Sequence, residues 1–245
     1  MDIINDKLAL HREIWYKKKI LRLIYAQWYR MIQADLKSGK KKTLEIGSGT
    51  GNFKEFKSDI IASDIENRPW LDKVFDAHDM PFTDGELSNI VMIDVLHHLV
   101  DPIRFFREVG RVLEPGGRII MLEPFPSFFS LPVYKCFHPE PFDFKKNYFL
   151  QGGTDEKKDA WESNQAIPFL LFYRQKKDFL RLFENKYEII KKKRISFLLY
   201  PLSGGFEHRS FIPGFLFPVF SILEKILAPL ASLLAFRCYI VLEKK

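Results

Sequence analysis

The sequence predicts an α/β fold whose strands are mostly parallel. Four largely apolar runs, at residues 44–46, 60–63, 90–93 and 118–124, are typical of strands that are covered on both faces. A helical pattern separates the last two runs, so that strand and helix alternate along the chain. Such alternation indicates a parallel sheet, in which ligands bind outside the carboxyl ends of the strands.

The helix between these two runs has a clear start signal. Asp101 is a favoured N-cap residue, and Pro102 follows at the first helical position. Apolar residues then recur at helical spacing and predict a stripe that faces the core: Ile103, Phe106, Val109, Val112 and Leu113. Gly116 and Gly117 are expected to end this helical region.

The first strand runs into a glycine turn with the sequence Gly-Ser-Gly-Thr-Gly at 47–51. Gly47, Gly49 and Gly51 permit backbone angles and approach distances that a side chain would block. Glu45 stands beside the turn, where a phosphate loop would favour lysine, and the absence of a following Gly-Lys-Ser/Thr excludes a nucleoside-triphosphate P-loop. The spacing also differs from the dinucleotide fingerprint G-x-G-x-x-G. A ligand that brings a positively charged amino-acid group fits the turn better.

An acidic residue follows each of two further apolar runs. Asp64 ends the second apolar run, where a carboxylate can accept hydrogen bonds from both hydroxyls of a ribose. The alternative for Asp64 is a turn or a helix cap. Asp94 ends the run at 90–93, again on the edge where open α/β sheets place ligands.

Together these motifs resemble the class I S-adenosylmethionine-dependent methyltransferases, and in particular the methyltransferase type 11 family. The resemblance extends from about Thr43 to Glu123 and includes Asp-Ala-His-Asp-Met-Pro-Phe at 76–82 and the segment 87–99. It implies a Rossmann-like sheet of seven strands, mostly parallel with an antiparallel last strand, and helices on both faces. It also implies S-adenosyl-L-methionine as cofactor and S-adenosyl-L-homocysteine as product.

The resemblance further implies which residues hold the cofactor. Asp76 would meet the adenine amino group, and the backbone N–H of Ala77 would meet a ring nitrogen. The segment that begins at Asp94 would pass beneath the methionine part. The predicted set is Glu45, Gly47, Ser48, Gly49, Thr50, Gly51, Asp64, Ile65, Asp76, Ala77, His78, Asp94, Val95 and Leu96. No metal ligand is predicted.

Three histidines are candidate catalytic bases. His97 and His98 follow Asp94 closely, and His138 is the only histidine in the long segment after the strand at 118–124. Histidine titrates near neutrality and can act as a general base. The alternative for His97 or His98 is packing and hydrogen bonding within its own turn. Methyl transfer needs a base only if the proton of the nucleophile must leave early.

Composition favours one globular domain in a reducing compartment. The 245 residues, 47% of them hydrophobic, can bury a full core. Cys136 and Cys238 are far apart and lack metal-ligand spacing, so a cytoplasmic protein is expected, with membrane association as the alternative. The net charge of +7 comes without a nucleic-acid recognition pattern, and nucleic acid is not an expected partner. An anionic substrate or membrane surface fits this charge at least as well.

Four segments are predicted within the single domain, residues 1–245. Residues 1–37 are expected to form a helical cap over the cofactor pocket, and residues 40–123 the cofactor-binding core. Residues 124–166, which are rich in aromatics, are expected to form a lid insert, because long loops in compact domains are usually functional. Residues 201–235 are an apolar insert before the last strand, which is expected at 236–242.

The sequence is compatible with several contact surfaces for the apolar insert. Glu224, Lys225 and three prolines interrupt it, so it is not expected to span a membrane. It is expected to contact a membrane interface, to cover an acyl or isoprenoid substrate, or to pack on the core or on a second subunit in a homodimer.

The sequence therefore predicts a methyltransferase that acts on a small-molecule, sugar or lipid-linked acceptor by O- or C-methylation. Asp-Val-Leu-His stands at 94–97 in place of Asn/Asp-Pro-Pro-Tyr/Phe, which disfavours methylation of nucleic-acid amino groups. One alternative is a non-catalytic S-adenosylmethionine-binding subunit that docks on a membrane or a partner. A second is an NAD-dependent oxidoreductase, which the loop spacing disfavours.

Overall fold

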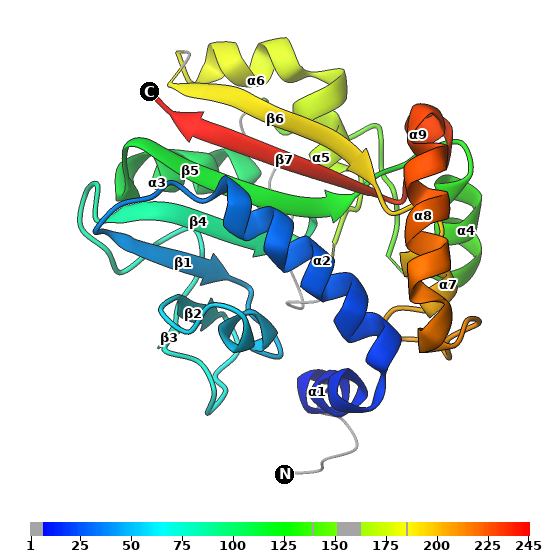
Figure 1. Cartoon of the computed structure of the whole chain (residues 1–245). Coiled ribbons are helices and arrows are strands. Elements are labelled where there is room, and N and C mark those ends of the chain that lie inside the picture. The colour runs from blue at the N-terminus through cyan, green and yellow to red at the C-terminus, as the bar shows by residue number, and fades with distance from the viewer. Residues whose placement is uncertain (1–6, 139, 151–162, 185) are drawn as a thin grey trace.

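The computed structural model describes residues 7–138, 140–150, 163–184 and 186–245. One seven-stranded sheet runs through it in the order β3-β2-β1-β4-β5-β7-β6 (Figure 1). The strands are β1 (Lys42–Ile46), β2 (Ile61–Asp64), β3 (Lys73–Val74), β4 (Leu87–Ile93), β5 (Leu113–Pro124), β6 (Tyr187–Ile195) and β7 (Arg237–Lys244). The first five strands pair in parallel, whereas β7 is antiparallel to both β5 and β6. The predicted α/β sheet with an antiparallel last strand is confirmed.

Helices cover both faces of the sheet, with α2 in front and α3 behind in Figure 1. The α-helices are α1 (Lys7–Lys17), α2 (Lys19–Asp35), α3 (Pro102–Val112), α4 (Ser130–Phe137), α5 (Ile167–Phe169), α6 (Lys176–Leu182), α7 (Leu199–Ser203), α8 (Phe217–Leu227) and α9 (Ala231–Leu234). A π-helical turn at Leu170–Arg174 joins α5 to α6. Short 3₁₀ turns stand at Asn52–Glu55, Leu96–His98, Gly214–Leu216 and Ala228–Leu230.

Alternate residues of the central strands face two separate cores. Met92 of β4 packs in the cluster that contains Phe106 of α3, whereas its neighbour Val91 packs in the cluster that contains Trp28 of α2. Successive side chains of a strand point to opposite faces, so a strand covered on both sides is apolar at most positions. This is the physical reason for the continuous apolar runs.

Two predicted boundaries were wrong. The helix that begins at Pro102 ends at Val112, and Leu113 already belongs to β5. Gly116 therefore lies within the strand, with a positive φ of 70°, beside a shift in the register between β4 and β5. Such an irregularity is typical of a β-bulge, for which glycine is suited.

The apolar insert is more continuous than predicted. Residues Gly214–Leu234 form one helical run of 21 residues that is long and apolar enough to cross a membrane, by length and composition only. Pro218 and Pro229 do not break it, because each stands in the first turn of its segment, where a missing N–H is tolerated. The run lies along the edge of the domain beside α4 and α7 (Figure 1).

Candidate functional site

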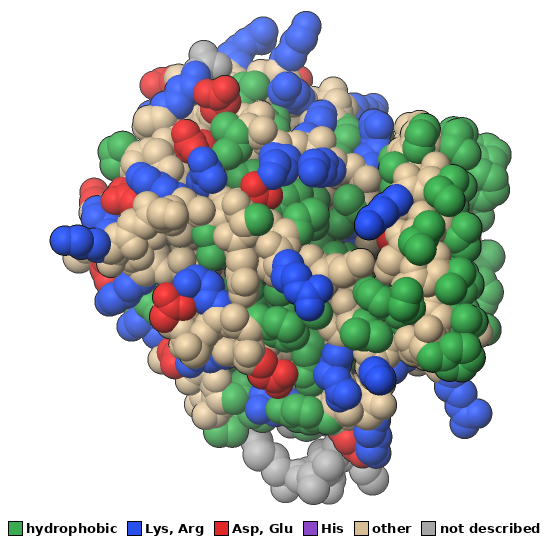
Figure 2. All heavy atoms as spheres, viewed as in Figure 1, with side chains coloured by type: hydrophobic (Ala, Val, Ile, Leu, Met, Phe, Trp, Pro, Cys, Tyr) green, Lys and Arg blue, Asp and Glu red, His purple; other side chains and the backbone are tan. Residues whose placement is uncertain are grey.

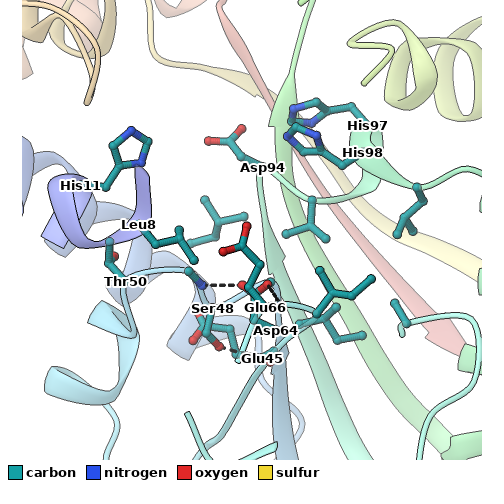
Figure 3. A pocket seen from close by; sticks show the side chains of 18 of the residues that line it. Leu8, His11, Glu45, Ser48, Thr50, Asp64, Glu66, Asp94, His97 and His98 are labelled. Carbon is teal, nitrogen blue, oxygen red and sulfur yellow. Dashed lines mark hydrogen bonds between the residues drawn. The ribbon is translucent and has the colours of Figure 1, made fainter. Parts of the chain in front are cut away.

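A cavity of about 840 Å³ opens at the carboxyl ends of the parallel strands. Figure 3 shows Glu45 and Asp64 at one end of it and Asp94, His97 and His98 at the other. We call these the cofactor end and the acceptor end. Residues of α1, of α7 and of the segment after α7 also line the cavity, so parts of the chain distant in sequence enclose it: Lys7, Leu8, His11, Tyr200, Phe206 and Glu207.

The glycine turn is pressed against the segment that follows β4. Gly47 has a φ of +65°, and a Cβ atom there would stand 2.3 Å from Cγ2 of Val95. A side chain at position 47 would therefore both strain the backbone and push Val95 away. The turn and the strand end at Asp94 are thus held at the contact distance that only glycine allows.

The carboxylate of Asp64 holds the turn from the other side. Its Oδ2 accepts a hydrogen bond from the backbone N–H of Gly49 (2.9 Å), and its Oδ1 accepts one from that of Glu66 (3.2 Å). Trp70 donates its indole N–H to the carbonyl oxygen of Gly49 (2.8 Å). Arg12 of α1 donates to the carbonyl oxygen of Thr50 (2.6 Å), which fastens α1 to the turn.

Glu45 is a buried acid at the cofactor end. Burial raises the pKa of its carboxyl group to about 8, against a hydrogen bond from Ser48 that lowers it, and the nearby charge of Asp64 adds to the rise. Its Oε2 is buried and has no hydrogen-bond partner among the described residues. An unpaired buried carboxyl oxygen costs free energy, so the site is suited to a ligand that brings a hydrogen-bond donor with positive charge.

Asp94 connects the parallel half of the sheet to its last strand. Its backbone has a positive φ of 58°, which is uncommon for a residue other than glycine. Its carboxylate forms an ion pair with Arg237, the first residue of β7, whose side chain is buried. The guanidinium also lies over the ring of Tyr200, 4.3 Å from its centre.

His97 is held between two carboxylates. Its Nδ1 lies 2.7 Å from Oε2 of Glu123, and its Nε2 lies 3.4 Å from Oε2 of Glu140. Burial alone would lower the pKa of His97, but the hydrogen bonds with Glu123 and Glu140 outweigh it and raise the pKa to about 9. At neutral pH the ring therefore carries protons on both nitrogens. In this state it has no lone pair with which to accept a proton.

The carboxylate of Glu140 also lies near His98 and His138. Its Oε1 lies 3.9 Å from Nε2 of His98, and its Oε2 accepts a hydrogen bond from Nε2 of Gln165 (3.1 Å). Burial would raise the pKa of Glu140, but the hydrogen bond and charge of His97, with the charges of His98 and His138, hold it well below its usual range. Glu140 is therefore ionised throughout the neutral range.

His138 is fixed by the same amide. Nε2 of Gln165 lies 2.9 Å from its Nδ1, and an amide NH₂ group can only donate, so Nδ1 accepts and the proton of the neutral ring is assigned to Nε2. Burial lowers the pKa of His138, against the charge of Glu140 that raises it. The ring is neutral at pH 7 and presents an N–H donor.

The comparisons with known proteins agree with this geometry. Residues 44–121 match the model of the type 11 family, described as "Methyltransferase domain". The demethylmenaquinone methyltransferase of Paenarthrobacter aurescens is 28% identical over 148 residues, which cover 54% of this chain and 51% of the relative. The chain carries a type 11 methyltransferase domain.

Further comparisons find a related sequence and the same fold in other methyltransferases. The ubiquinone/menaquinone biosynthesis C-methyltransferase UbiE of Geotalea daltonii is 33% identical over 107 residues, 43% of each chain. The chain spans about half the length of the curated relatives it matches. A SAM-dependent methyltransferase from Archaeoglobus fulgidus has the same fold, with a TM-score of 0.54 at 16% identity over 91% of this chain and 94% of its own.

Nearly all the predicted site residues of the methyltransferase domain line the cavity. His97, His98 and His138 do so, and so do all the predicted cofactor-binding residues except Gly51 and Leu96. Leu96 is fully buried in the core, and its backbone N–H donates to Oε1 of Glu123 (2.8 Å). A Cβ atom on Gly51 would come within 2.9 Å of Trp70, so that this glycine serves the packing of the turn. The binding roles of the lining residues stay predictions.

Asp76 and His78 form a pair at the rim of the cofactor end. Oδ1 of Asp76 lies 2.6 Å from Nδ1 of His78 and accepts its backbone N–H (2.8 Å). Burial would raise the pKa of Asp76, but these hydrogen bonds outweigh it and lower the pKa. Asp76 is therefore an ionised acceptor beside Ala77, as its predicted adenine contact requires.

Several side chains at the acceptor end were not predicted as site residues: Glu123, Glu140, Gln165 and Arg237. Glu123 and Arg237 are parts of buried strands and carry no local motif. Glu140 and Gln165 belong to the predicted lid insert, of which residues 151–162 lie outside the described part of the chain. The one available signal was a charged residue within an apolar strand, which is costly to bury without a partner.

Two groups at the acceptor end have the donor atoms for a metal ion. They are His97, His98 and Glu140, and Asp94, His97 and Glu123, with donor atoms within 4.8 Å of one another in each group. His97 belongs to both groups, and its two nitrogens already face carboxylates. A metal at either place would have to displace one of these contacts.

Proposed function

We propose that this chain is an S-adenosylmethionine-dependent methyltransferase that methylates an oxygen or a carbon of a small or lipid-linked acceptor. The observation that carries the proposal is a single cavity that joins the unpaired oxygen of Glu45 to the histidine cluster around Glu140. One end offers what an amino-acid cofactor needs, and the other offers aromatic walls with a few polar groups.

The residues at the cofactor end fit S-adenosylmethionine. Oε2 of Glu45 would receive the ammonium group, Asp64 the ribose hydroxyls and Asp76 the adenine amino group. The glycine turn packs directly against Val95, since a Cβ on Gly47 would collide with it, and this contact holds the turn at the edge of the cavity. When bound, the cofactor supplies a methyl group on a sulfonium, which is already activated for displacement. The protein then has to orient the acceptor and exclude water.

His98 is the histidine best placed to take a proton from the acceptor. His97 is doubly protonated between two carboxylates, and Nδ1 of His138 already accepts from Gln165. His98 lines the cavity and lies near Oε1 of Glu140, which would stabilise the imidazolium once it has formed. His138 is suited to donate its Nε2–H to an acceptor oxygen and thereby orient it.

The walls of the acceptor end support a partly apolar acceptor. Tyr134, Tyr200 and Phe206 line this end beside Arg237. One curated relative is named for methyl transfer to demethylmenaquinone and another for C-methylation in ubiquinone and menaquinone biosynthesis. Small-molecule acceptors in these relatives support the same class for this chain.

Calorimetric titration tests the cofactor. The protein is titrated with S-adenosylmethionine, S-adenosylhomocysteine and NAD, alongside Asp64→Ala and the control Asp59→Ala, which removes an exposed carboxylate outside the cavity. We expect saturable binding of both adenosyl ligands, weakened roughly 10- to 100-fold in Asp64→Ala because hydrogen bonds to a charged group are lost, and unchanged in Asp59→Ala. Binding of NAD in place of the adenosyl ligands would contradict the proposal.

A screen of acceptors with labelled S-adenosylmethionine then tests catalysis. Quinone precursors, phenols and lipid-linked sugars represent the proposed classes. Transfer of label to a carbon or oxygen is expected. Cofactor binding without transfer to any of them, followed by activity in a partner protein, would favour the docking-subunit alternative.

A further inference from the structure

The helical run Gly214–Leu234 has two apolar faces. One face packs on the domain and is half-buried: Phe217, Phe220, Ser221, Glu224, Leu227, Ala231 and Leu234. The opposite face is exposed and nearly as apolar: Val219, Ile222, Leu223, Ile226, Leu230 and Leu233. A helix that is apolar all round normally lies in a protein core or in lipid. Here the structure covers only one of its sides.

The exposed side continues onto α4. The backbone N–H of Phe129 donates to the carbonyl oxygen of Leu233 (3.0 Å), which joins the two helices. Phe128 is 74% exposed, and further apolar side chains of α4 and of the turn before α8 extend the surface: Phe129, Val133, Phe137, Phe211 and Phe215. We call this combined surface the apolar face. Part of this surface is visible as the green side chains at the right of Figure 2.

The exposed charges on the helical run and on α4 are all basic. The only acid in residues 211–235 is Glu224, and its carboxylate is turned inward. Its Oε1 accepts the backbone N–H groups of Phe197, Leu198 and Leu199, each at 2.9 Å. The exposed charges on the two helices are Lys225 and Lys135. Near the start of the segment stand exposed Arg209 and exposed Glu207, whose carboxylate faces Lys7 of α1 (3.6 Å). The surface is thus apolar with basic groups and without an exposed acid on either helix.

We propose that the apolar face docks the protein onto an anionic lipid bilayer, with the helical run lying in the plane of the interface. Apolar side chains flanked by lysine and arginine are suited to the boundary between acyl chains and negatively charged headgroups. A second copy of this chain fits less well, because a two-fold contact through this face would bring the same basic groups together.

The helical run is held too firmly on the domain to cross the bilayer. Ser221 accepts a hydrogen bond from Gln27 of α2 (3.4 Å), and Glu224 is engaged with the start of α7. Phe217 and Phe220 pack against the core beneath α2. A spanning helix would have to break all these contacts and carry Glu224 into hydrocarbon, which is costly for a carboxylate.

Docking would bring the acceptor end close to the lipid. α4 presents Tyr134 to the cavity and Phe137, 64% exposed, to the apolar face. His208 approaches the carbonyl oxygen of Phe137 (3.2 Å), so that the segment after α7 meets α4 there. This placement favours a lipid-linked acceptor over a freely soluble one, an inference that rests on the proposed function.

Vesicle sedimentation tests the docking without any need for activity. The full chain is mixed with vesicles of phosphatidylcholine alone or with phosphatidylglycerol. We expect it to sediment with the anionic vesicles, at least tenfold less in the double variant Ile222→Glu with Ile226→Glu, and about fivefold less for each of Lys135→Ala and Lys225→Ala. The control, Leu182→Glu with Ile190→Glu, changes two exposed apolar residues on α6 and β6 and is expected to bind vesicles as the unchanged protein does.

Two results would overturn the docking proposal. One is failure of the unchanged protein to sediment with anionic vesicles. The other is a stable dimer at micromolar concentration, seen by sedimentation velocity and dispersed by the Ile222→Glu, Ile226→Glu variant. Titration of the same variants with S-adenosylhomocysteine keeps the proposals distinct. Vesicle binding without cofactor binding would reject the function and retain the docking, and thermal melting would identify a variant that fails to fold.

Discussion

The cofactor end of the cavity and the apolar face are built in opposite ways. The cofactor end depends on a few positions close together in sequence, where one added atom would change the geometry, as at Gly47 beside Val95. The apolar face depends on many interchangeable side chains from α4, α8 and α9, of which none is needed individually. The comparison shows that a motif specifies a site residue by residue, whereas composition specifies only a kind of surface.

The largest effect is expected at the glycine turn. Gly47→Val adds a branched side chain at φ +65°, where its Cβ alone would stand 2.3 Å from Val95. We expect the affinity for S-adenosylhomocysteine in calorimetry to fall at least about 100-fold, because the strained turn can no longer meet the ligand. Gly39→Val is the control, since its Cβ would meet only Glu114 at 3.9 Å. Equal affinity in the two variants would remove the special role of Gly47.

The next effect separates binding from catalysis at the acceptor end. His98→Gln is expected to lower kcat about 100-fold or more for an acceptor whose proton must leave early, as loss of a general base does. Cofactor affinity should stay unchanged, because His98 lies at the opposite end from Glu45 (Figure 3). The readouts are initial rates over a pH series and calorimetry. A larger loss in His138→Gln than in His98→Gln would transfer the role of base to His138.

A smaller effect concerns the inner and outer sides of α8. Glu224→Ala leaves three backbone N–H groups without their acceptor and is expected to lower the free energy of unfolding by about 1–3 kcal/mol. Lys225→Ala, one residue further on but exposed, should change it by less than about 0.5 kcal/mol. Urea denaturation measures both. Similar values for the two variants would mean that the contacts of Glu224 do not hold the helix on the domain.

The smallest effect is a proton linkage at Glu45. With a pKa of about 8 the carboxyl group is mostly protonated at pH 7, and binding of an ammonium group favours the ionised form. Binding should therefore release up to about one proton at pH 7, and affinity should rise roughly tenfold from pH 6 to pH 7, a range in which the ammonium group of the ligand keeps its proton. Calorimetry in buffers of different ionisation enthalpy measures this release. Glu45→Gln should abolish it, and an unchanged release would assign the proton to another group.

The same pKa shift has a consequence for stability. The folded protein binds the proton of Glu45 more tightly than the unfolded chain, in which the carboxyl group titrates near its ordinary value. The contribution of Glu45 to the stability of the ligand-free protein therefore falls as pH rises from about 4.5 to about 8. Addition of the cofactor should reduce this fall, because it provides the ionised form with a partner.

Much of the fold and of the cofactor end could be predicted because both depend on short-range patterns. The apolar run at 90–93 and the glycine turn each constrain their own backbone, and Asp64 ends a strand at the edge where ligands bind. The arrangement of the acceptor end could be predicted less well from the sequence. That His97 would be doubly protonated and His138 neutral depends on Glu123, Glu140 and Gln165, which come from other segments.

The sequence by itself determined the α/β sheet, its antiparallel last strand, the resemblance to the type 11 methyltransferases and most of the positions that line the cavity. Only the tertiary structure decided which carboxylates and amide surround the histidines, that Arg237 pairs with Asp94, and that Glu224 faces inward while Ile222 and Ile226 face outward. The physical reason is the range of the interactions. Backbone angles and hydrophobic periodicity act within a few residues, whereas pKa values, ion pairs and exposed surfaces are set by neighbours that the chain brings together only when it folds.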